Sequence, residues 1–196
     1  MRNDDAGQII AELFASEGAA GYLGEPVTQA VHMLQAAVLA ERDGADDALI
    51  AAALLHDVGH FTRAVTGREL TEGTDDGHSG AGACWLSQWF GEEVTEPVRL
   101  HVDAKRYLCA AVPGYAAALS PASRYTLTVQ GGPMQGPDLA GFEANPYAAA
   151  ACRVRRWDDA AKDPQMPVPS FDHFRPVLRR LSRQRAAGRE RQPGRS

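Results

Sequence analysis

The sequence predicts a single all-α domain, and three observations carry that prediction. Nearly every periodic segment repeats its apolar residues at helical spacing. Capping residues, prolines and glycines stand where those segments begin and end. The 196 residues, 44% hydrophobic and 23% charged, contain no internal repeat and no linker between two domains. We therefore expect one domain over residues 1–182, followed by a basic and frayed tail over residues 183–196.

The first third of the chain predicts three helices. Residues 5–17 form the first, and residues 26–43 form the second, with Pro26 in its first turn, where a proline fits well. Asp46 is suited to cap the third helix, which runs to His56. The apolar residues expected to face the core from the first two helices are Ile9, Ile10, Leu13, Phe14, Val27, Val31, Leu34 and Val38.

The rest of the chain predicts a loop and five more helices. Residues 59–75 are rich in glycine, threonine and charge, which is typical of a loop. A serine cap followed by Pro121, and a later Gly-Gly pair, delimit one short helix. The other helices are expected around residues 75–90, at 93–110 with an opening after Thr95-Glu96-Pro97, from Asn145-Pro146 to about Lys162, and from Phe171 to Arg185.

Composition excludes several classes of partner. A net charge of -5 argues against nucleic acid, because phosphate contacts need a basic surface. No apolar run reaches the ~18 residues of a membrane span, and the N-terminus lacks the pattern of a secretion signal. We therefore expect no membrane partner and a cytoplasmic location. The cysteines have no CxxC spacing and predict buried free thiols in a reducing compartment: Cys84, Cys109 and Cys152.

A set of histidines and aspartates predicts a metal site. Five of the six histidines lie between positions 32 and 101. Neutral imidazoles and carboxylates are the ligands that iron, manganese and zinc prefer. The candidate ligands are His32, His56, Asp57, His78, His101 and Asp158. Any one of these histidines alone is better explained as a satisfied core or surface residue.

The set as a whole favours two metal ions. A histidine next to an aspartate at a helix end, as in His56-Asp57, can aim both side chains at one ion pair. Asp158 lies inside a predicted helix, where an inward carboxylate is costly without a cation. Helical bundles build metal sites by projecting such side chains inward from facing helices. We therefore predict a dinuclear site, bridged by Asp57, with open positions for a substrate and a small molecule.

These residues resemble the signature of the HD-domain superfamily. Its His…His-Asp…Asp motif is matched by His32, His56-Asp57 and Asp158, and the pair that its dinuclear members add is matched by His78 and His101. The resemblance spans about residues 22–162 and implies a helical bundle around a dinuclear centre. It leaves the reaction open, since the superfamily contains phosphohydrolases as well as a smaller group of diiron oxygenases.

Further motifs favour the oxygenase branch. They resemble those of the organophosphonate oxygenases, the glycine-forming 2-amino-1-hydroxyethylphosphonate dioxygenases. The matching segments are Tyr22-Leu-Gly-Glu25-Pro-Val-Thr-Gln-Ala-Val-His32, His56-Asp-Val-Gly-His60, His101-Val-Asp-Ala-Lys105, Gln130-Gly-Gly-Pro-Met134 and Arg155-Arg-Trp-Asp158-Asp-Ala-Ala-Lys162. Each segment is weak alone, whereas the combination is specific.

Several of these residues are candidates for substrate contact. Lys105 shares a helix face with His101, so its ammonium would neutralise a phosphonate or phosphate beside the metals. Arg155 could offer the same anion a bidentate contact. For both, a solvated helix face is the alternative. Ser123 would donate to the anion or only begin a helix, and the resemblance implies a substrate contact for Gln130.

Tyr22 and Glu25 lie in a glycine-flanked loop ahead of His32. We interpret this loop as a lid, in which Tyr22 occupies the open iron position at rest and Glu25 pairs with a substrate ammonium. The alternative is a helix-entry loop with an exposed tyrosine and a first-turn glutamate. His60, one turn past His56, would support the ligands or contact the substrate.

The resemblance implies a mixed-valent Fe(II)/Fe(III) pair that uses dioxygen to cleave a carbon–phosphorus bond. The substrate would be a 1-hydroxy-2-aminoethylphosphonate or an N-methylated relative, and the products would be phosphate and an amino acid such as glycine or a betaine. An HD-domain phosphohydrolase using the same ions is the first alternative. A ligand-sensing domain without turnover is the second. The sequence leaves the amine substituent, the metals and the oligomeric state open.

Overall fold

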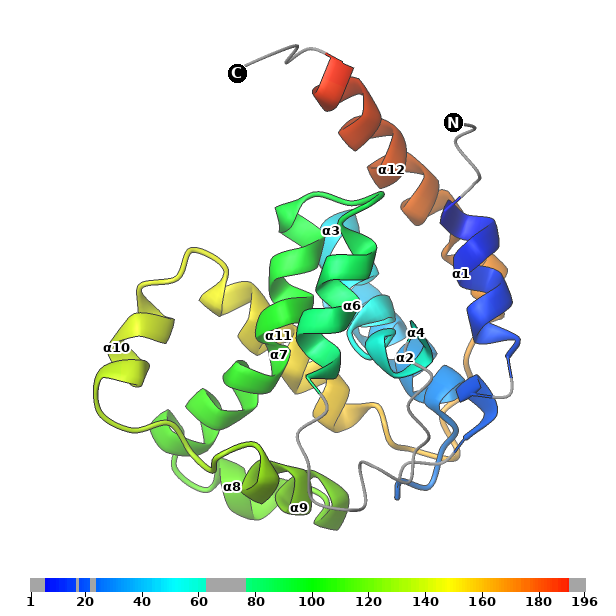
Figure 1. The fold of residues 1–196 in the computed structure, drawn as a ribbon. Coiled ribbons are helices and arrows are strands. Elements are labelled where there is room, and N and C mark those ends of the chain that lie inside the picture. The colour runs from blue at the N-terminus through cyan, green and yellow to red at the C-terminus, as the bar shows by residue number, and fades with distance from the viewer. Residues whose placement is uncertain (1–5, 17, 22–23, 63–76, 191–196) are drawn as a thin grey trace.

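A computed structural model describes residues 6–16, 18–21, 24–62 and 77–190, and Figure 1 shows their arrangement. Over these residues the chain is all-α, as predicted, without a strand. The elements are α1 (Ala6–Phe14), η1 (Gly18–Ala20), α2 (Gln29–Arg42), α3 (Asp47–Leu55), α4 (Gly59–Thr62), α6 (His78–Leu86), α7 (Glu92–Ala111), α8 (Tyr115–Ala118), α9 (Pro121–Val129), α10 (Pro137–Glu143), α11 (Ala148–Ala160), η2 (Phe171–His173) and α12 (Arg175–Glu190). None of the described helices has the length and apolar character needed to cross a membrane.

Helix α3 lies at the centre of the fold. Its residues from Leu49 to Leu55 are all buried, because α2, α7, α11 and α12 pack around it. A helix that is apolar on every side is stable only when it is enclosed in this way. The end of this buried helix places His56 and Asp57 in the interior of the protein.

Two helices begin at residues whose side chains cap the first turn of the helix. Asp46 accepts a hydrogen bond of 2.9 Å from the backbone N–H of Leu49, which confirms the predicted cap of α3. Ser120 accepts one of 3.0 Å from the N–H of Ser123, and Pro121 follows as the first residue of α9, again as predicted. Both caps join residues only three apart, so the local sequence is sufficient to specify them.

The start of α2 differs from the prediction. The side chain of Thr28 accepts a hydrogen bond of 3.3 Å from the N–H of Val31, so the helix begins at Gln29. Pro26 therefore lies ahead of the helix rather than in its first turn. The threonine prevails because its hydroxyl satisfies a free N–H of the first turn, whereas a proline only tolerates that position.

Pro97 lies inside α7 rather than at its opening. The helix begins at Glu92 and continues through the proline. Pro97 lacks the N–H that would bond to the carbonyl of Glu93, which is a local cost. The packing of α7 against α3, α6 and α11 offsets this cost, and Pro97 is itself buried.

Short helices and helix ends account for the other differences. Residues 59–62 form α4 at the start of the predicted loop, and residues 63–76 lie outside the described part of the chain. The short helices α8 and α10 occupy a region where the sequence predicts none, and α11 begins at Ala148, after Asn145-Pro146. Helix α12 continues to Glu190, into the predicted tail. Short helices depend on tertiary contacts, because few internal hydrogen bonds offset their nucleation.

The three cysteines are free thiols, as predicted, but the prediction that all are buried is wrong. Cys84 is exposed, and Cys109 and Cys152 are half-buried. Helix α6 turns another face to the core, through residues such as Gly82, Ala83 and Leu86. Helical periodicity therefore points Cys84 outward.

Candidate metal centre

His32 on α2 and His56 at the end of α3 meet in the interior. Their Nε2 atoms lie 3.1 Å apart. Each Nδ1 lies 2.8 Å from a backbone carbonyl, that of Ala161 for His32 and that of Ala53 for His56. With Nδ1–H donating to these carbonyls, both Nε2 lone pairs point to the same place. Contacts of this kind orient the histidine ligands of metals.

His78 at the start of α6 and His101 in α7 form a second pair. Their Nε2 atoms lie 3.2 Å apart, and Nδ1 of His101 lies 2.7 Å from the carbonyl oxygen of Val98. The ring of His60 stacks on that of His78, with ring centroids 4.1 Å apart. His60 therefore contacts the second pair from the side.

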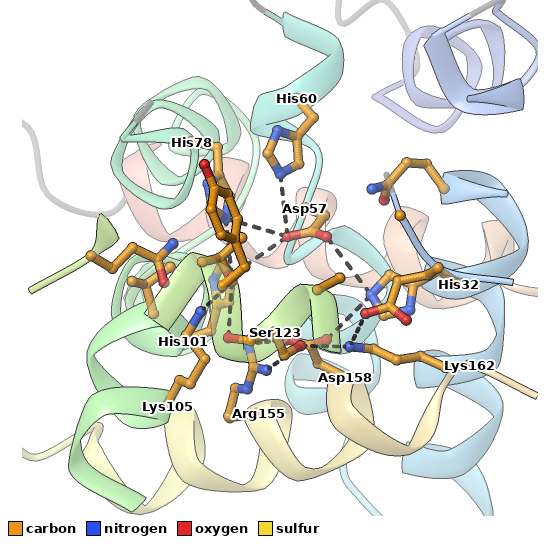
Figure 2. A pocket seen from close by; sticks show the side chains of 18 of the residues that line it. His32, Asp57, His60, His78, His101, Lys105, Ser123, Arg155, Asp158 and Lys162 are labelled. Atoms are coloured by element: carbon orange, nitrogen blue, oxygen red, sulfur yellow. Dashed lines mark hydrogen bonds and ion pairs between the residues drawn. The ribbon is translucent and has the colours of Figure 1, made fainter. Parts of the chain in front are cut away.

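The carboxylate of Asp57 lies between the two histidine pairs, and Figure 2 shows it between His32 on one side and His78 and His101 on the other. Its Oδ2 lies 3.5 Å from Nε2 of His56 and 3.7 Å from that of His32. Its Oδ1 lies 3.4 Å from Nε2 of His78 and 3.5 Å from that of His101. One carboxylate oxygen thus faces each pair, which is the arrangement that a ligand shared by two ions needs.

Asp158 on α11 completes the first group. Its Oδ1 lies 3.3 Å from Nε2 of His32 and 3.9 Å from that of His56. Its Oδ2 lies 2.6 Å from Nη1 of Arg155, and Nε of Arg155 donates to Asp159 at 3.1 Å. The buried guanidinium therefore holds Asp158 in place from the side opposite the histidines.

The charges of the site suit a cation. Burial opposes the ionisation of Asp57, but the neighbouring His56 and a hydrogen bond with His101 hold the pKa of Asp57 well below its usual range. Burial also opposes the ionisation of Asp158, but the charge of the neighbouring Arg155 holds the pKa of this carboxyl well below its usual range. Burial also lowers the pKa of His56 to about 4, so this imidazole is neutral at pH 7, as a metal ligand must be.

The residues fit two metal ions. Two lone pairs at 3.1 Å repel each other unless a positive charge lies beside them. Burial opposes a proton on His32, yet Asp158 raises the pKa of that imidazole above its ordinary value, so the site attracts positive charge at this point. Four imidazoles and two carboxylates are donors that iron, manganese and zinc accept. One ion would face His32, His56 and Asp158, the other would face His78 and His101, and Asp57 would serve both.

Gly59 makes this convergence possible. A Cβ at this position would overlap the backbone carbonyl of His78, so any other residue would push α4 away from α6. The close approach of the two backbones brings the start of α6 next to the residues that follow α3. His78 reaches Asp57 as a result.

The candidate ligands line a cavity of about 400 Å³, except for His56, which is fully buried behind them. Three basic residues also line this cavity: Lys105, Arg155 and Lys162. Nζ of Lys105 donates to the hydroxyl of Thr126 at 2.9 Å. Burial, reinforced by Arg155, lowers the pKa of Lys105 to about 8. Three cationic side chains beside a candidate metal centre make the cavity suited to an anion.

Glu25 is paired within the protein. Its Oε1 accepts a hydrogen bond of 2.8 Å from Nζ of Lys162 and one of 2.6 Å from the hydroxyl of Ser120. Nζ of Lys162 also donates to Ser123 at 2.8 Å. The charge of Glu25 is thus already partnered by a lysine. Tyr22, the other half of the predicted lid, lies outside the described residues.

The structure brings together the six predicted ligands and, apart from Tyr22, places the other predicted site residues around the same cavity. The latter are Glu25, His60, Lys105, Ser123, Gln130 and Arg155. Gln29, Thr126 and Lys162 also line the cavity, although no role was predicted for them from the sequence. Each lies three or four residues from a predicted site residue, so helical spacing was the signal that could have found them.

Comparison with known proteins shows which family and which relatives the chain is similar to. Residues 30–130 match the family model described as HD domain. The chain is 44% identical over 174 residues to the 1-hydroxy-2-(trimethylamino)ethyl phosphonate dioxygenase (glycine-betaine-forming) of Leisingera caerulea, with 89% of each chain covered. It is 43% identical over 168 residues to the hydroxymethylphosphonate dioxygenase of Gimesia maris, with 84% of this chain and 82% of that protein covered. It is also 32% identical over 171 residues to the uncharacterized protein L432 of Acanthamoeba polyphaga mimivirus, with 86% and 78% covered.

Proposed function

This chain belongs to the HD-domain family, and two of its relatives are phosphonate dioxygenases. On that basis we propose that it uses dioxygen to cleave a carbon–phosphorus bond. The proposed substrate is a 1-hydroxy-2-aminoethylphosphonate or an N-methylated analogue. One substrate and one dioxygen give one amino acid, such as glycine or a betaine, one phosphate and one proton. Dioxygen is then the sole oxidant that the reaction requires.

The observation that carries the proposal is the meeting of a candidate dinuclear centre with three cations in one cavity. A phosphonate bears negative charge, and Lys105, Arg155 and Lys162 line the cavity that holds the candidate ligands. The same metals would suit a phosphohydrolase. The oxygenase is favoured because two relatives more than 40% identical over most of the chain are phosphonate dioxygenases.

We propose iron for both metal positions, as a mixed-valent Fe(II)/Fe(III) pair. The ligands would be His32, His56, Asp57, His78, His101 and Asp158. Such a pair, when bound, would supply the Lewis acidity and the electrons that dioxygen chemistry needs. The protein would exclude bulk water from the metals, since all four histidine ligands are buried.

The other side chains of the cavity would bind and orient the substrate. Lys105 would hold the phosphonate through a charge-assisted hydrogen bond, with Ser123 and Gln130 beside it. The substrate hydroxyl and the adjacent carbon would then face the metals, in the orientation that reaction requires. Arg155 already contacts Asp158 and Asp159. We therefore propose that it positions Asp158 and adds positive charge behind the phosphonate.

Oxygen uptake tests the proposal. Protein loaded with iron is supplied with 2-amino-1-hydroxyethylphosphonate, its trimethylated counterpart or hydroxymethylphosphonate. We expect oxygen consumption and phosphate release in equal amounts with at least one of them, and neither without oxygen. Protein loaded with zinc, which has no redox chemistry, is the control and should consume no oxygen. Phosphate release from a phosphate ester without oxygen uptake would instead identify a hydrolase.

The pairing of Glu25 with Lys162 gives a second prediction. Replacing Glu25 with alanine removes the partner that holds Lys162 in the cavity, so binding of every phosphonate should weaken, by about three- to tenfold. The KM of hydroxymethylphosphonate, which has no amine, is the decisive measurement. Glu96→Ala, which removes a similar ion pair with Arg99 on α7, is the matched control and should leave the KM unchanged. A rise in KM confined to substrates with an amine would show instead that Glu25 reads the ammonium, as the lid interpretation holds.

A further inference from the structure

Gln29 presents a buried hydrogen-bond acceptor to the cavity. It is the first residue of α2, three residues before His32, and it lines the cavity while only 8% exposed. Its Oε1 is shielded from solvent and has no hydrogen-bond partner in the part of the chain that the structure describes. A buried acceptor without a partner is costly, so native proteins seldom retain one without a reason. A ligand in the cavity would supply the missing donor.

The acidic groups that line the cavity are already engaged. Glu25 accepts hydrogen bonds from Lys162 and Ser120. Asp57 and Asp158 belong to the candidate metal centre. The neutral amide oxygen of Gln29, in contrast, is a buried acceptor on the wall formed by α2, and it has no partner among the described residues.

A second amide faces the cavity from another wall. Oε1 of Gln130 is also buried and without a partner among the described residues. Gln130 follows Thr126 by one helical turn, and Thr126 accepts the hydrogen bond of Lys105. Gln130 thus lies beside the cation that would hold the phosphonate, whereas Gln29 lies on a different helix, next to His32.

We propose that Oε1 of Gln29 accepts a hydrogen bond from the substrate ammonium and selects substrates that retain an N–H. This inference rests on the proposed function. A carbonyl oxygen repels the phosphonate, and the substrate hydroxyl faces the metals, so the ammonium is the donor left for it. A trimethylammonium group has no N–H and would leave Oε1 buried without a partner. Sites built around a hydrogen bond reject analogues that cannot form it. The chain then prefers a primary amine, unlike the relative named for a trimethylamino substrate.

The test compares three phosphonates in wild-type protein and two variants, Gln29→Leu and Gln29→Glu. The substrates are 2-amino-1-hydroxyethylphosphonate, its trimethylated counterpart and hydroxymethylphosphonate. Wild type should show a higher kcat/KM for the primary amine than for the trimethylated compound. In Gln29→Leu the ratio of these two values should fall by about ten- to a hundredfold, the effect of one hydrogen bond to a charged group. Gln29→Glu keeps an acceptor and should keep the preference.

Controls separate selectivity from general damage. Iron content and melting temperature report whether each variant folds and loads metal. Gln130→Leu, the same change on the other wall, should lower kcat/KM for all three substrates by similar factors and leave the ratio unchanged. A Gln29→Leu protein that loses activity equally on all three substrates, or a wild type that prefers the trimethylated compound, would overturn the inference.

Binding gives the same answer without turnover. Calorimetric titration of the iron-loaded protein in the absence of oxygen measures the affinities for the primary and trimethylated compounds. Gln29→Leu should reduce their ratio to the same extent as in the kinetic test, and an unchanged ratio would refute the role of Gln29. If wild type binds all three compounds but never consumes oxygen, the proposed reaction fails while the binding ratio still decides the role of Gln29.

Discussion

Replacing Asp57 with alanine is expected to remove both metals and all dioxygenase activity. Asp57 presents one oxygen to each histidine pair, at 3.4 to 3.7 Å from all four Nε2 atoms. Without it, each ion would lose a ligand, and the two cations would face each other without the negative charge that lies between them. Iron per chain, measured on protein expressed with added iron, should fall from two ions to near zero. Oxygen uptake with a hydroxyphosphonate should fall to background.

Two further variants make the Asp57 prediction specific. Asp57→Asn retains the size of the side chain but not its charge, so it should also lose iron. Asp103→Ala removes a carboxylate that lies on α7 and pairs with Arg106, away from the candidate centre, and should keep both ions. An Asp57→Ala protein with full iron and full activity would refute the bridging role.

Replacing Lys105 with alanine should weaken substrate binding far more than metal binding. Lys105 is 2% exposed and lines the cavity beside the candidate ligands. Loss of a charge-assisted contact costs about 1.5–3 kcal/mol, which is roughly ten- to a hundredfold in affinity. The affinity for the phosphonate, measured without oxygen, should fall by that factor while iron content stays at the wild-type level. An equal loss of iron and of affinity would make Lys105 a structural residue.

The pH dependence of binding provides a second readout for Lys105. Burial, reinforced by Arg155, lowers the pKa of this lysine to about 8. Below that pH the side chain is charged and attracts the phosphonate, and above it the proton and the attraction are lost. Phosphonate affinity should therefore fall as the pH rises through about 8. Lys105→Arg keeps its charge at higher pH and should not show this decrease. A decrease that persists unchanged in Lys105→Ala would assign the titration to another group.

Much of the fold follows from local interactions that the sequence reveals. The caps made by Asp46 and Ser120 join residues three apart, so they could be predicted without knowledge of the fold. The interior of α7 could not be predicted in the same way. Local rules place the opening of the helix after Pro97, but packing against three other helices keeps α7 continuous through this residue. Where a local preference and tertiary packing disagree, the packing decides.

In the candidate site, too, some features could be predicted from the sequence and others could not. The types and spacing of the six ligands were sufficient to predict a dinuclear centre, because metal chemistry restricts which residues can take part. The partners of Glu25 and Arg155 were not predicted. The partners of Arg155 lie three and four residues further along α11, so helical spacing could have indicated them. Lys162, in contrast, lies far from Glu25 in sequence. Such pairings depend on rotamers and distances that exist only in the folded chain.

The sequence by itself determined the all-α class, the HD-domain family and the identity of the candidate ligands. These properties depend on periodicity, residue type and order along the chain. The tertiary structure alone decided that each oxygen of Asp57 faces a different histidine pair, that Glu25 is already paired, and that the side-chain oxygen of Gln29 has no partner among the described residues. The reason is physical. Hydrogen bonds and ion pairs act over a few ångströms, so the partner of a side chain is set only when helices distant in sequence pack together.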